Sequence, residues 1–283
     1  MTSKAQQLRD LIAAGEHFIA ADAYSAITGK IVEQVGFKAA YLGGHACSAF
    51  HYAMPDYGMY SQVEQMEQAN RIAEAMNIPL IADADTLGET VADAFHFTRR
   101  YTKTDVAGIH VEDGINPRHS SYINDLQPIP EMQARLDACV KGRGDSSLVI
   151  IARCDEFYPK SYRGAGDCDL ENAIERGKAY AEAGADALVF PLASPDVCRT
   201  LVAELPVPVC VLGGVVEGTA FALHTGWGWM GAAKIHMERA RELMETGEVK
   251  FDSSFPEKNE LIEMDLYDAI ISEWAQKTGR PTH

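Results

Sequence analysis

The feature that most limits how this chain can fold is a regular alternation of short apolar segments with longer amphipathic ones. The apolar segments are nearly continuous in Ile, Val, Leu and Ala, which is typical of strands buried on both faces of a parallel sheet. We predict seven such strands at residues 17–22, 39–43, 79–85, 108–113, 148–155, 187–192 and 207–212. Helical patterns lie between them at residues 26–35, 62–75, 91–101, 129–141, 169–183 and 196–204. Asp169 is a good N-cap for one of these helices, and Gly184 is placed to end it.

Seven strands in order, with a helical pattern after each of the first six and no break in composition, predict an α/β protein with a (β/α)8 TIM-type barrel. The chain has 283 residues, and such barrels typically take about 250. An open doubly wound sheet would need a glycine-rich turn after the first strand, and residues 21–29 do not provide one.

The pattern becomes irregular after the seventh strand. An eighth strand fits residues 219–224, but only residues 213–218 precede it, and a parallel crossover usually needs a dozen residues or more. Either the seventh helix is missing, or residues 219–224 are not a regular barrel strand.

Helical patterns at residues 229–245 and 257–278 follow the barrel. We therefore predict one barrel domain over 1–283, with a core at 1–227 and a C-terminal helical arm at 228–283. The arm either packs against a neighbouring subunit or caps the bottom of its own barrel.

Composition excludes several classes of protein. The formal net charge of −16 would repel a phosphate backbone, so nucleic acid is not an expected partner. No segment approaches the roughly 20 apolar residues of a membrane span, and the first residues lack the layout of a signal peptide. The six cysteines are scattered without a CxxC pair, which is typical of buried thiols in a reducing cytosol. We expect a cytoplasmic protein without membrane partners.

Charged side chains end three consecutive predicted strands. Asp83 and Asp85 end the third strand, Glu112 and Asp113 the fourth, and Arg153 and Asp155 the fifth. Barrel enzymes carry their chemistry at this rim, and oxygen ligands of this kind favour Mg2+, with Mn2+ as an alternative. The competing interpretation is that each Asp caps the next helix. Arg153 either pairs with Asp83 or Glu112, or clamps a substrate carboxylate, and both can hold together.

Further candidates lie in the loops at the same rim. Gly43 and Gly44 end the second strand, where their backbone N–H groups could bind an anion. Asp56 lies in a turn and is either a turn former or a carboxylate that supports a metal site. His45 and His119 could supply a proton, because a free imidazole titrates near neutrality, although such loop histidines are often solvated surface residues.

The ordered motifs resemble the isocitrate lyase/phosphoenolpyruvate mutase superfamily from about residue 8 to about residue 215. They are Gly43-Gly44, Pro55-Asp56-Tyr57-Gly58, Asp83-Ala84-Asp85, Glu112-Asp113 and residues 151–155. The resemblance implies a Mg2+-dependent barrel, usually a homotetramer that exchanges a helix between subunits. Members make or break C–C or P–C bonds beside a 2-oxo or enolate centre.

The resemblance also implies roles for individual residues. Asp83 and Asp85 would hold the metal, with Asp56 and Glu112 next to it. Gly43, Gly44 and His45 would line the substrate oxyanion, and Arg153 would bind the substrate carboxylate. We accordingly take Asp83, Asp85 and Glu112 as the metal set and Gly43, Gly44, His45 and Arg153 as substrate-binding. The catalytic candidates are Arg153, Asp56, His45, His119 and Ser120.

Several positions depart from the lyases of this family. Ser120 stands where the lyases have an acidic cysteine, and Leu192 replaces their glutamate after strand six. The pattern is most similar to the oxaloacetate decarboxylase branch, although His224 is only an approximate counterpart of that branch's histidine near strand eight.

We expect a Mg2+-dependent carbon–carbon lyase or decarboxylase that acts through an enolate on a small 2-oxo or 2-hydroxy dicarboxylic acid, similar to oxaloacetate or methylisocitrate. One alternative is a phosphonopyruvate-type C–P bond enzyme, either a mutase or a hydrolase. The other is a non-catalytic, ligand-binding member of the family.

Overall fold

The computed structural model describes residues 2–117, 119, 125–157, 168–248 and 257–280. The chain divides into two compact units, Met1–Met230 and Gly231–His283. The first unit contains the barrel.

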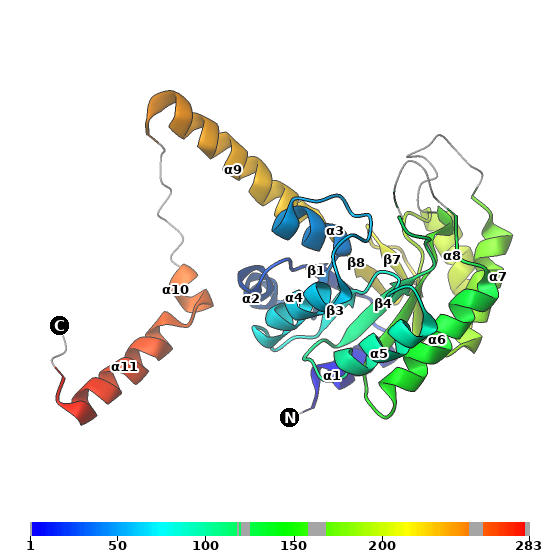
Figure 1. Cartoon of the computed structure of the whole chain (residues 1–283), viewed down its shortest axis with the longest axis horizontal. Helices are drawn as coiled ribbons and strands as arrows, with labels where there is room; N and C mark the ends of the chain where they lie inside the picture. The colour runs from blue at the N-terminus through cyan, green and yellow to red at the C-terminus, as the bar shows by residue number, and fades with distance from the viewer. Residues whose placement is uncertain (1, 118, 120–124, 158–167, 249–256, 281–283) are drawn as a thin grey trace. The chain divides into compact units, whose positions relative to one another are not determined.

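The first unit is a closed barrel of eight parallel strands, as the sequence predicts (Figure 1). Each strand pairs with its neighbours in chain order, and β8 closes the barrel against β1. The strands are β1 (Phe18–Asp22), β2 (Ala39–Leu42), β3 (Leu80–Asp83), β4 (Gly108–Glu112), β5 (Val149–Arg153), β6 (Ala187–Val189), β7 (Val209–Leu212) and β8 (Phe221–Leu223).

Helices cover the outside of the barrel, and their ends follow local capping rules. α1 (Lys4–Ala13) precedes β1. The connecting helices are α2 (Ala26–Val35), α4 (Gln62–Glu74), α5 (Val91–Tyr101), α6 (Ile129–Arg143), α7 (Leu170–Glu182) and α8 (Pro195–Glu204). Ser25, Ser61 and Thr90 each form a capping box at the start of a helix. Asp169 caps α7 through the backbone N–H of Asn172, which confirms the predicted cap.

The inside of the barrel has an apolar lower part and a charged upper part. The apolar part includes Phe18 and Phe221, whose rings stack with centroids 5.0 Å apart. Toward the carboxyl ends of the strands, the pairing register places Asp83 beside His110 and Glu112 beside Arg153. Successive side chains alternate between the two faces of a strand, so these charged groups project inward above the apolar part.

The structure resolves the irregularity at the eighth strand. β8 pairs in parallel with β7 and with β1, so it is a regular barrel strand. The segment 213–220 joins β7 to β8 without a helix, and Val216 in this connection packs with Val211 and Ala222. Of the two predicted alternatives, the missing seventh helix is therefore correct.

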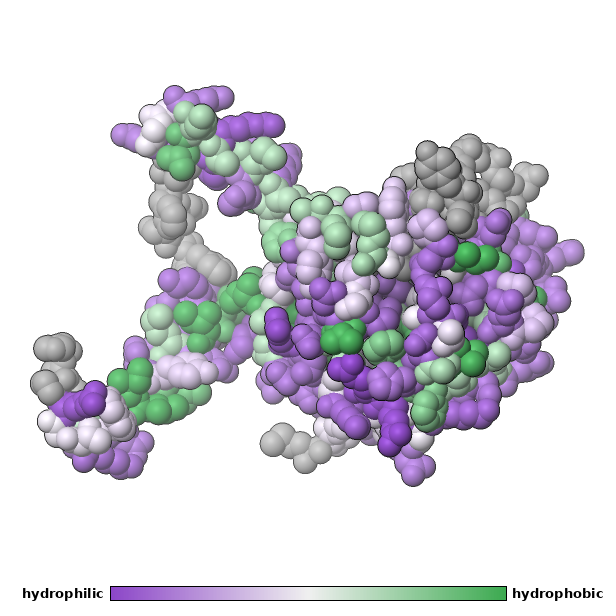
Figure 2. Space-filling view, in the orientation of Figure 1, coloured by the Kyte–Doolittle hydropathy of each residue, from purple (hydrophilic) through white to green (hydrophobic). Residues whose placement is uncertain are grey.

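The C-terminal helices carry an exposed apolar surface. α9 (Trp227–Thr246) begins at the end of the first unit and continues into the second, which also contains α10 (Lys258–Leu261) and α11 (Met264–Thr278). The predicted single helix at 257–278 is wrong, because Glu263 adopts a left-handed φ of 56° between α10 and α11. Figure 2 shows apolar residues on these helices, and the exposed ones include Ile235, Met237, Leu243, Met244, Leu266, Tyr267, Ile270 and Ile271. In the part of the chain that the structure describes, no helix has the length and apolar character needed to cross a membrane.

Candidate active site

Asp83 and Asp85 converge on one small space at the mouth of the barrel. Asp83 accepts hydrogen bonds from the Gly44 N–H at 3.0 Å and from the Asp85 N–H at 2.9 Å. A Cβ atom added to Gly44 would lie 2.9 Å from Asp83 Oδ2 and 2.9 Å from Asp85 Oδ1. Both carboxylates therefore border the space that a side chain at position 44 would fill. The left-handed φ of 52° at Asp85 is an uncommon backbone conformation of the kind that clusters at functional sites.

The Arg153 guanidinium lies among the carboxylates of the rim. Its Nε and Nη2 donate to the two oxygens of Asp155 at 2.6 and 3.1 Å, in a bidentate pair. Its Nη1 lies 3.2 Å from Glu112 Oε2 and 3.8 Å from Asp83 Oδ2. The predicted ion pairs of Arg153 are thus present, and Nη1 is the nitrogen that faces the metal candidates. Burial disfavours the charged form of Asp155, but the adjacent guanidinium holds the pKa of this carboxyl below its usual range.

His119 brings the loop after β4 into the same cluster. Its Nδ1 lies 3.5 Å from Asp56 Oδ2, and its Nε2 lies 3.5 Å from Asp155 Oδ2 and 3.3 Å from Arg153 Nη2. Burial disfavours the charged imidazolium, but hydrogen bonds to Asp155 and Asp56 outweigh it and raise the pKa of His119 to about 9. The structure therefore joins His119 and Asp56 to the charged rim. Ser120 lies outside the described residues.

Two polar groups below this rim were not predicted from the sequence. The Tyr41 hydroxyl lies 2.8 Å from His110 Nε2, and His110 Nδ1 lies 3.6 Å from Asp83 Oδ1. His110 and Tyr41 are both buried. The signal for His110 was present in the sequence, because it precedes Glu112 by two residues and so shares its face of the strand.

The residues of the rim fit a divalent cation. Five carboxylates (Asp56, Asp83, Asp85, Glu112 and Asp155) surround two cationic side chains, Arg153 and His119. With all of these groups ionised, the cluster keeps three formal negative charges. A donor set dominated by carboxylate oxygens suits Mg2+ or Mn2+ better than softer metals.

A second group of candidate ligand atoms lies beside the predicted metal set. Among the described residues, single ligand atoms of Glu112, His119 and Asp155 lie within 4.8 Å of one another. Glu112 thus belongs both to this group and to the predicted set, whereas Asp83 and Asp85 border the neighbouring space at Gly44. Asp155 is a further candidate ligand that the sequence analysis placed at the rim without giving it a role.

The remaining predicted residues lie at different parts of the mouth. A Cβ atom at Gly43 would lie 2.8 Å from the Thr225 hydroxyl. The exposed ring of His45 packs edge-on against Trp229, with centroids 5.1 Å apart. Leu192 is 57% exposed and has a left-handed φ of 61°. His224 follows Leu223, which belongs to the barrel core, so strand alternation places His224 toward the outside of the barrel.

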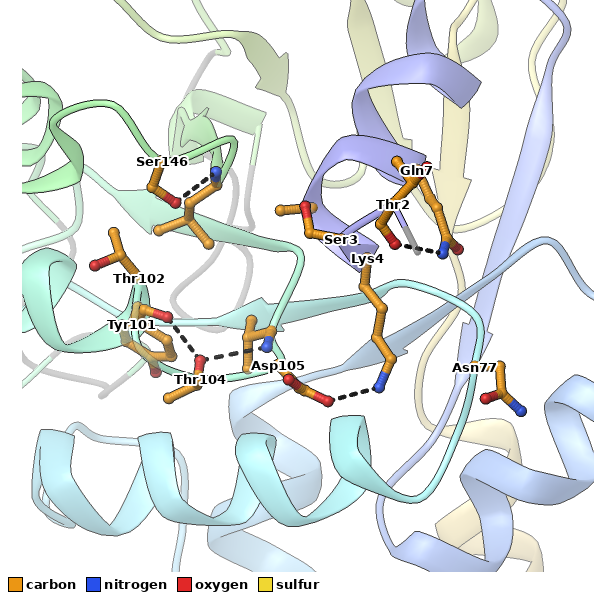
Figure 3. A pocket seen from close by; sticks show the side chains of 13 residues that line it. Thr2, Ser3, Lys4, Gln7, Asn77, Tyr101, Thr102, Thr104, Asp105 and Ser146 are labelled. Atoms are coloured by element: carbon orange, nitrogen blue, oxygen red, sulfur yellow. Dashed lines mark hydrogen bonds and ion pairs between the residues drawn. The ribbon is translucent and has the colours of Figure 1, made fainter.

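A cavity of about 570 Å³ lies at the opposite end of the barrel (Figure 3). Its lining includes Asn77, Asp105 and Ser146, which precede β3, β4 and β5. Lys4 on α1 pairs with Asp105 at 2.9 Å across it. Barrel enzymes place their chemistry at the carboxyl ends of the strands, so we assign no catalytic role to this cavity.

Comparison with known proteins assigns the chain to a family. The family model for phosphoenolpyruvate phosphomutase matches residues 8–231. The 2,3-dimethylmalate lyase of Eubacterium barkeri is 32% identical over 216 residues, which are 76% of this chain and 72% of the relative. An oxaloacetate decarboxylase of Chromohalobacter salexigens is 30% identical over 206 residues, 72% of this chain and 69% of the relative. For several other relatives the matched segment is less than two thirds of their length, and for one it is 48%.

A solved structure of phosphonopyruvate hydrolase in complex with oxalate and Mg2+ is similar to this chain. It has a TM-score of 0.80 and 25% sequence identity, and the match covers 96% of this chain and 98% of that chain. The chain belongs to the isocitrate lyase/phosphoenolpyruvate mutase superfamily. Its named relatives include lyases and decarboxylases, so the chain is a member of a family of enzymes. The resemblance found in the sequence is thereby confirmed.

Proposed function

We propose that this protein is a Mg2+-dependent carbon–carbon lyase or decarboxylase, with Mn2+ as an alternative metal. Its substrate is a small 2-oxo or 2-hydroxy dicarboxylic acid, and the reaction passes through an enolate. The observation that carries this proposal is the convergence of Asp83 and Asp85 on the space at Gly44, beside Glu112 and Arg153. Asp83, Asp85 and Glu112 are the proposed residues that hold the metal.

The side chains of the rim would have separate roles in binding the substrate and transferring a proton. When bound, the divalent ion would polarise the 2-oxo group and stabilise the negative charge of an enolate. Arg153, fixed by its bidentate pair with Asp155, presents Nη1 to the substrate carboxylate. His119, held between Asp56 and Asp155, is placed to give a proton to the carbon that the bond cleavage leaves negative.

Decarboxylation needs fewer catalytic groups than aldol-type cleavage, and we favour it slightly for this reason. It needs an electron sink, an arginine for the retained carboxylate and a final proton. Aldol-type cleavage also needs a base for the 2-hydroxyl and an acid for the leaving carbanion. The serine in place of the lyases' cysteine at position 120 argues against methylisocitrate-like substrates, and the similarity to an oxaloacetate decarboxylase supports the simpler reaction.

A C–P bond reaction is the second candidate. The similarity to phosphonopyruvate hydrolase supports it, because that enzyme shares this fold and its structure holds oxalate with Mg2+. The same metal and arginine would then bind a phosphonopyruvate-like acid.

We also propose that the protein acts as a homo-oligomer, a tetramer, in the cytoplasm. The arm at 228–283 exposes large apolar side chains on α9 and α11, and we propose that a second copy of the chain covers them. The six cysteines are free, and five of them are buried, which suits a reducing compartment. Light scattering after size-exclusion chromatography tests the assembly. A monomer at micromolar concentration would contradict it.

The function is tested by assaying the metal-stripped chain with and without Mg2+. Pyruvate release is followed from oxaloacetate, methylisocitrate, dimethylmalate and phosphonopyruvate, and phosphate release is followed for the last. Asp83→Ala should abolish both metal binding and turnover, whereas the matched variant Asp105→Ala, at the other end of the barrel, should retain both. Full activity of Asp83→Ala would refute the metal site. Metal and oxalate binding without turnover of any substrate would indicate the non-catalytic alternative.

A further inference from the structure

We infer that a buried bracing network, centred on Gln127 and completed by Arg135 and Arg176, fixes the spacing of the strand ends that hold the metal. We call these three side chains the brace. They are positioning residues, and their role rests on the proposed metal site. None of them was singled out by the sequence pattern, and all three are buried.

Gln127 connects to its surroundings through all four of its polar groups. Its backbone N–H donates to the Asp113 carbonyl at 2.7 Å, and its side-chain Nε2 donates to the Gly114 carbonyl at 3.2 Å. Its Oε1 accepts from Arg135 Nε at 3.3 Å, and its backbone carbonyl accepts from Arg176 Nη1 at 2.9 Å. Gln127 therefore ties the residues just after Glu112 to α6 and α7.

Arg135 on α6 holds the turn that follows Asp85. Its Nη1 donates to the carbonyls of Thr86 and Gly88 at 2.6 and 2.8 Å, and its Nη2 donates to the Glu89 carbonyl at 3.2 Å. A planar guanidinium can hold several carbonyls and Gln127 at the same time, which the ammonium of a lysine cannot reproduce in this geometry. Arg135 thus joins the Asp85 turn to Gln127.

Arg176 on α7 extends the network to the end of β5. Its Nη1 lies 3.3 Å from Asp113 Oδ2 and 2.9 Å from the Tyr180 hydroxyl, which itself donates to Asp113 Oδ2 at 2.6 Å. The other oxygen of Asp113 accepts from the Asp155 N–H at 2.9 Å. The position of Asp155, and with it the bidentate pair to Arg153, depends on this carboxylate.

The brace thus links the ends of three strands through hydrogen bonds that are buried at Gln127 and Arg176 and only partly buried where Arg135 meets the Gly88 and Glu89 carbonyls. One end of the network holds the turn after Asp85, the middle holds the residues after Glu112, and the far end holds Asp155. Buried hydrogen bonds of this kind fix geometry because water cannot replace a lost partner. A metal site needs its ligands at defined distances, and loss of the groups that orient them typically weakens metal binding by about 10- to 100-fold.

The test measures Mn2+ binding to the metal-stripped chain by electron paramagnetic resonance, independently of catalysis. Arg135→Lys and Gln127→Met each remove bonds of the brace while leaving every proposed metal ligand in place. We expect the Mn2+ dissociation constant to rise about tenfold or more in both variants. Because the ligands remain, activity should recover at saturating Mn2+, which general loss of structure would not allow.

Arg143→Lys is the matched control. Arg143 lies on the same helix as Arg135, and its Nη1 pairs with Asp186 Oδ2 at 2.6 Å, before the start of β6. Urea unfolding of each variant shows what share of the protein is folded during the binding measurement. If Arg135→Lys fails to fold, Gln127→Met decides the question.

Two results would overturn the brace while leaving the proposed function intact. One is wild-type Mn2+ affinity in both brace variants, and the other is equal weakening in Arg143→Lys. Failure of the wild-type chain to bind Mn2+ would instead refute the metal site, and the brace with it.

Discussion

Replacing Gly44 by alanine tests directly whether Asp83 and Asp85 serve one metal ion. The new methyl group would lie 2.9 Å from one oxygen of each carboxylate and 3.3 Å from Asp83 Cγ. Such contacts are well inside the roughly 3.5–4.0 Å at which carbon atoms pack favourably. In the metal-free protein the Asp85 carboxylate can turn away from the methyl, and Asp83 can shift by lengthening its bonds to the Gly44 and Asp85 N–H groups, whereas a bound ion would hold both in place. The cost therefore falls on metal binding more than on folding.

The size of the effect follows from the cost of overpacking, which is about 1–3 kcal/mol. This range corresponds to a rise of about 5- to 150-fold in the Mn2+ dissociation constant. Isothermal titration of the metal-stripped protein measures it. Gly44 lies at the start of α3 (Gly44–Ala46) and has no left-handed backbone, so alanine is compatible with the local conformation. Gly231→Ala is the control, because no heavy atom lies within 4 Å of its added Cβ. Unchanged Mn2+ affinity in Gly44→Ala would show that the two carboxylates do not share an ion.

Three further predictions concern stability and the mouth of the barrel. Tyr180→Phe removes the 2.6 Å hydrogen bond to the buried Asp113 carboxylate, and urea unfolding should show a loss of about 1.5–3 kcal/mol; a loss below about 0.5 kcal/mol would contradict a strong bond. Thr90→Ala removes the α5 cap and should cost about 1 kcal/mol at pH 7. The Thr90 hydrogen bonds lower the pKa of Asp93 in the folded protein. Their stabilisation is therefore present above the unfolded pKa of about 3.9 and is lost as the pH falls through the lower folded pKa. The loss of unfolding free energy in Thr90→Ala should accordingly be smaller in urea titrations near pH 3 than at pH 7, and an equal loss at both pH values would contradict this account. Leu192→Gly removes the strain of a left-handed backbone at an exposed leucine and should raise the midpoint of thermal unfolding. A lower midpoint would show that the contacts of the leucine side chain stabilise the fold by more than the backbone strain costs.

Much of the fold could be predicted because its signals are local. The bounds of α2 and α5 agree with the prediction residue for residue, since Ser25 and Thr90 are strong caps and Gly36 takes a left-handed φ after α2. The strands were predicted one to three residues too long, because the prediction counted turn residues at the strand ends, some of them apolar and some, such as Asp85 and Asp155, charged. Residues 190–192 show this, since the chain leaves the sheet after β6 (Ala187–Val189), and Leu192 turns with a positive φ.

The candidate site was predictable where a strand end alone determines it. Asp83, Glu112 and Arg153 meet because parallel strands in chain order bring their carboxyl ends to one rim. A strand-end aspartate can also serve a helix, as Asp22 does by accepting from the Gly228 N–H at 3.2 Å. Residue type alone does not distinguish these two uses.

The supporting contacts could not be predicted, because they join positions far apart in the chain. Tyr180 reaches Asp113 across 67 residues, and Arg135 reaches the Thr86 carbonyl across 49. Their donors lie on helices whose pattern shows only which side is buried, not which loop each side chain will meet. A buried arginine on the apolar face of a helix is the one local hint, since a buried guanidinium requires several acceptors.

The short connection at 213–220 makes one side of the barrel different from the others. Every other connection from the carboxyl end of one strand to the amino end of the next contains a helix outside the sheet. The connection from β7 to β8 has no helix, and Val216 packs on the outside of these strands in its place. Closing a longer loop costs little entropy, about 0.6 kcal/mol for each doubling of its length. The exposed Gly214, Val215, Glu217 and Gly218 of this connection are therefore positions where added sequence would displace no covering helix.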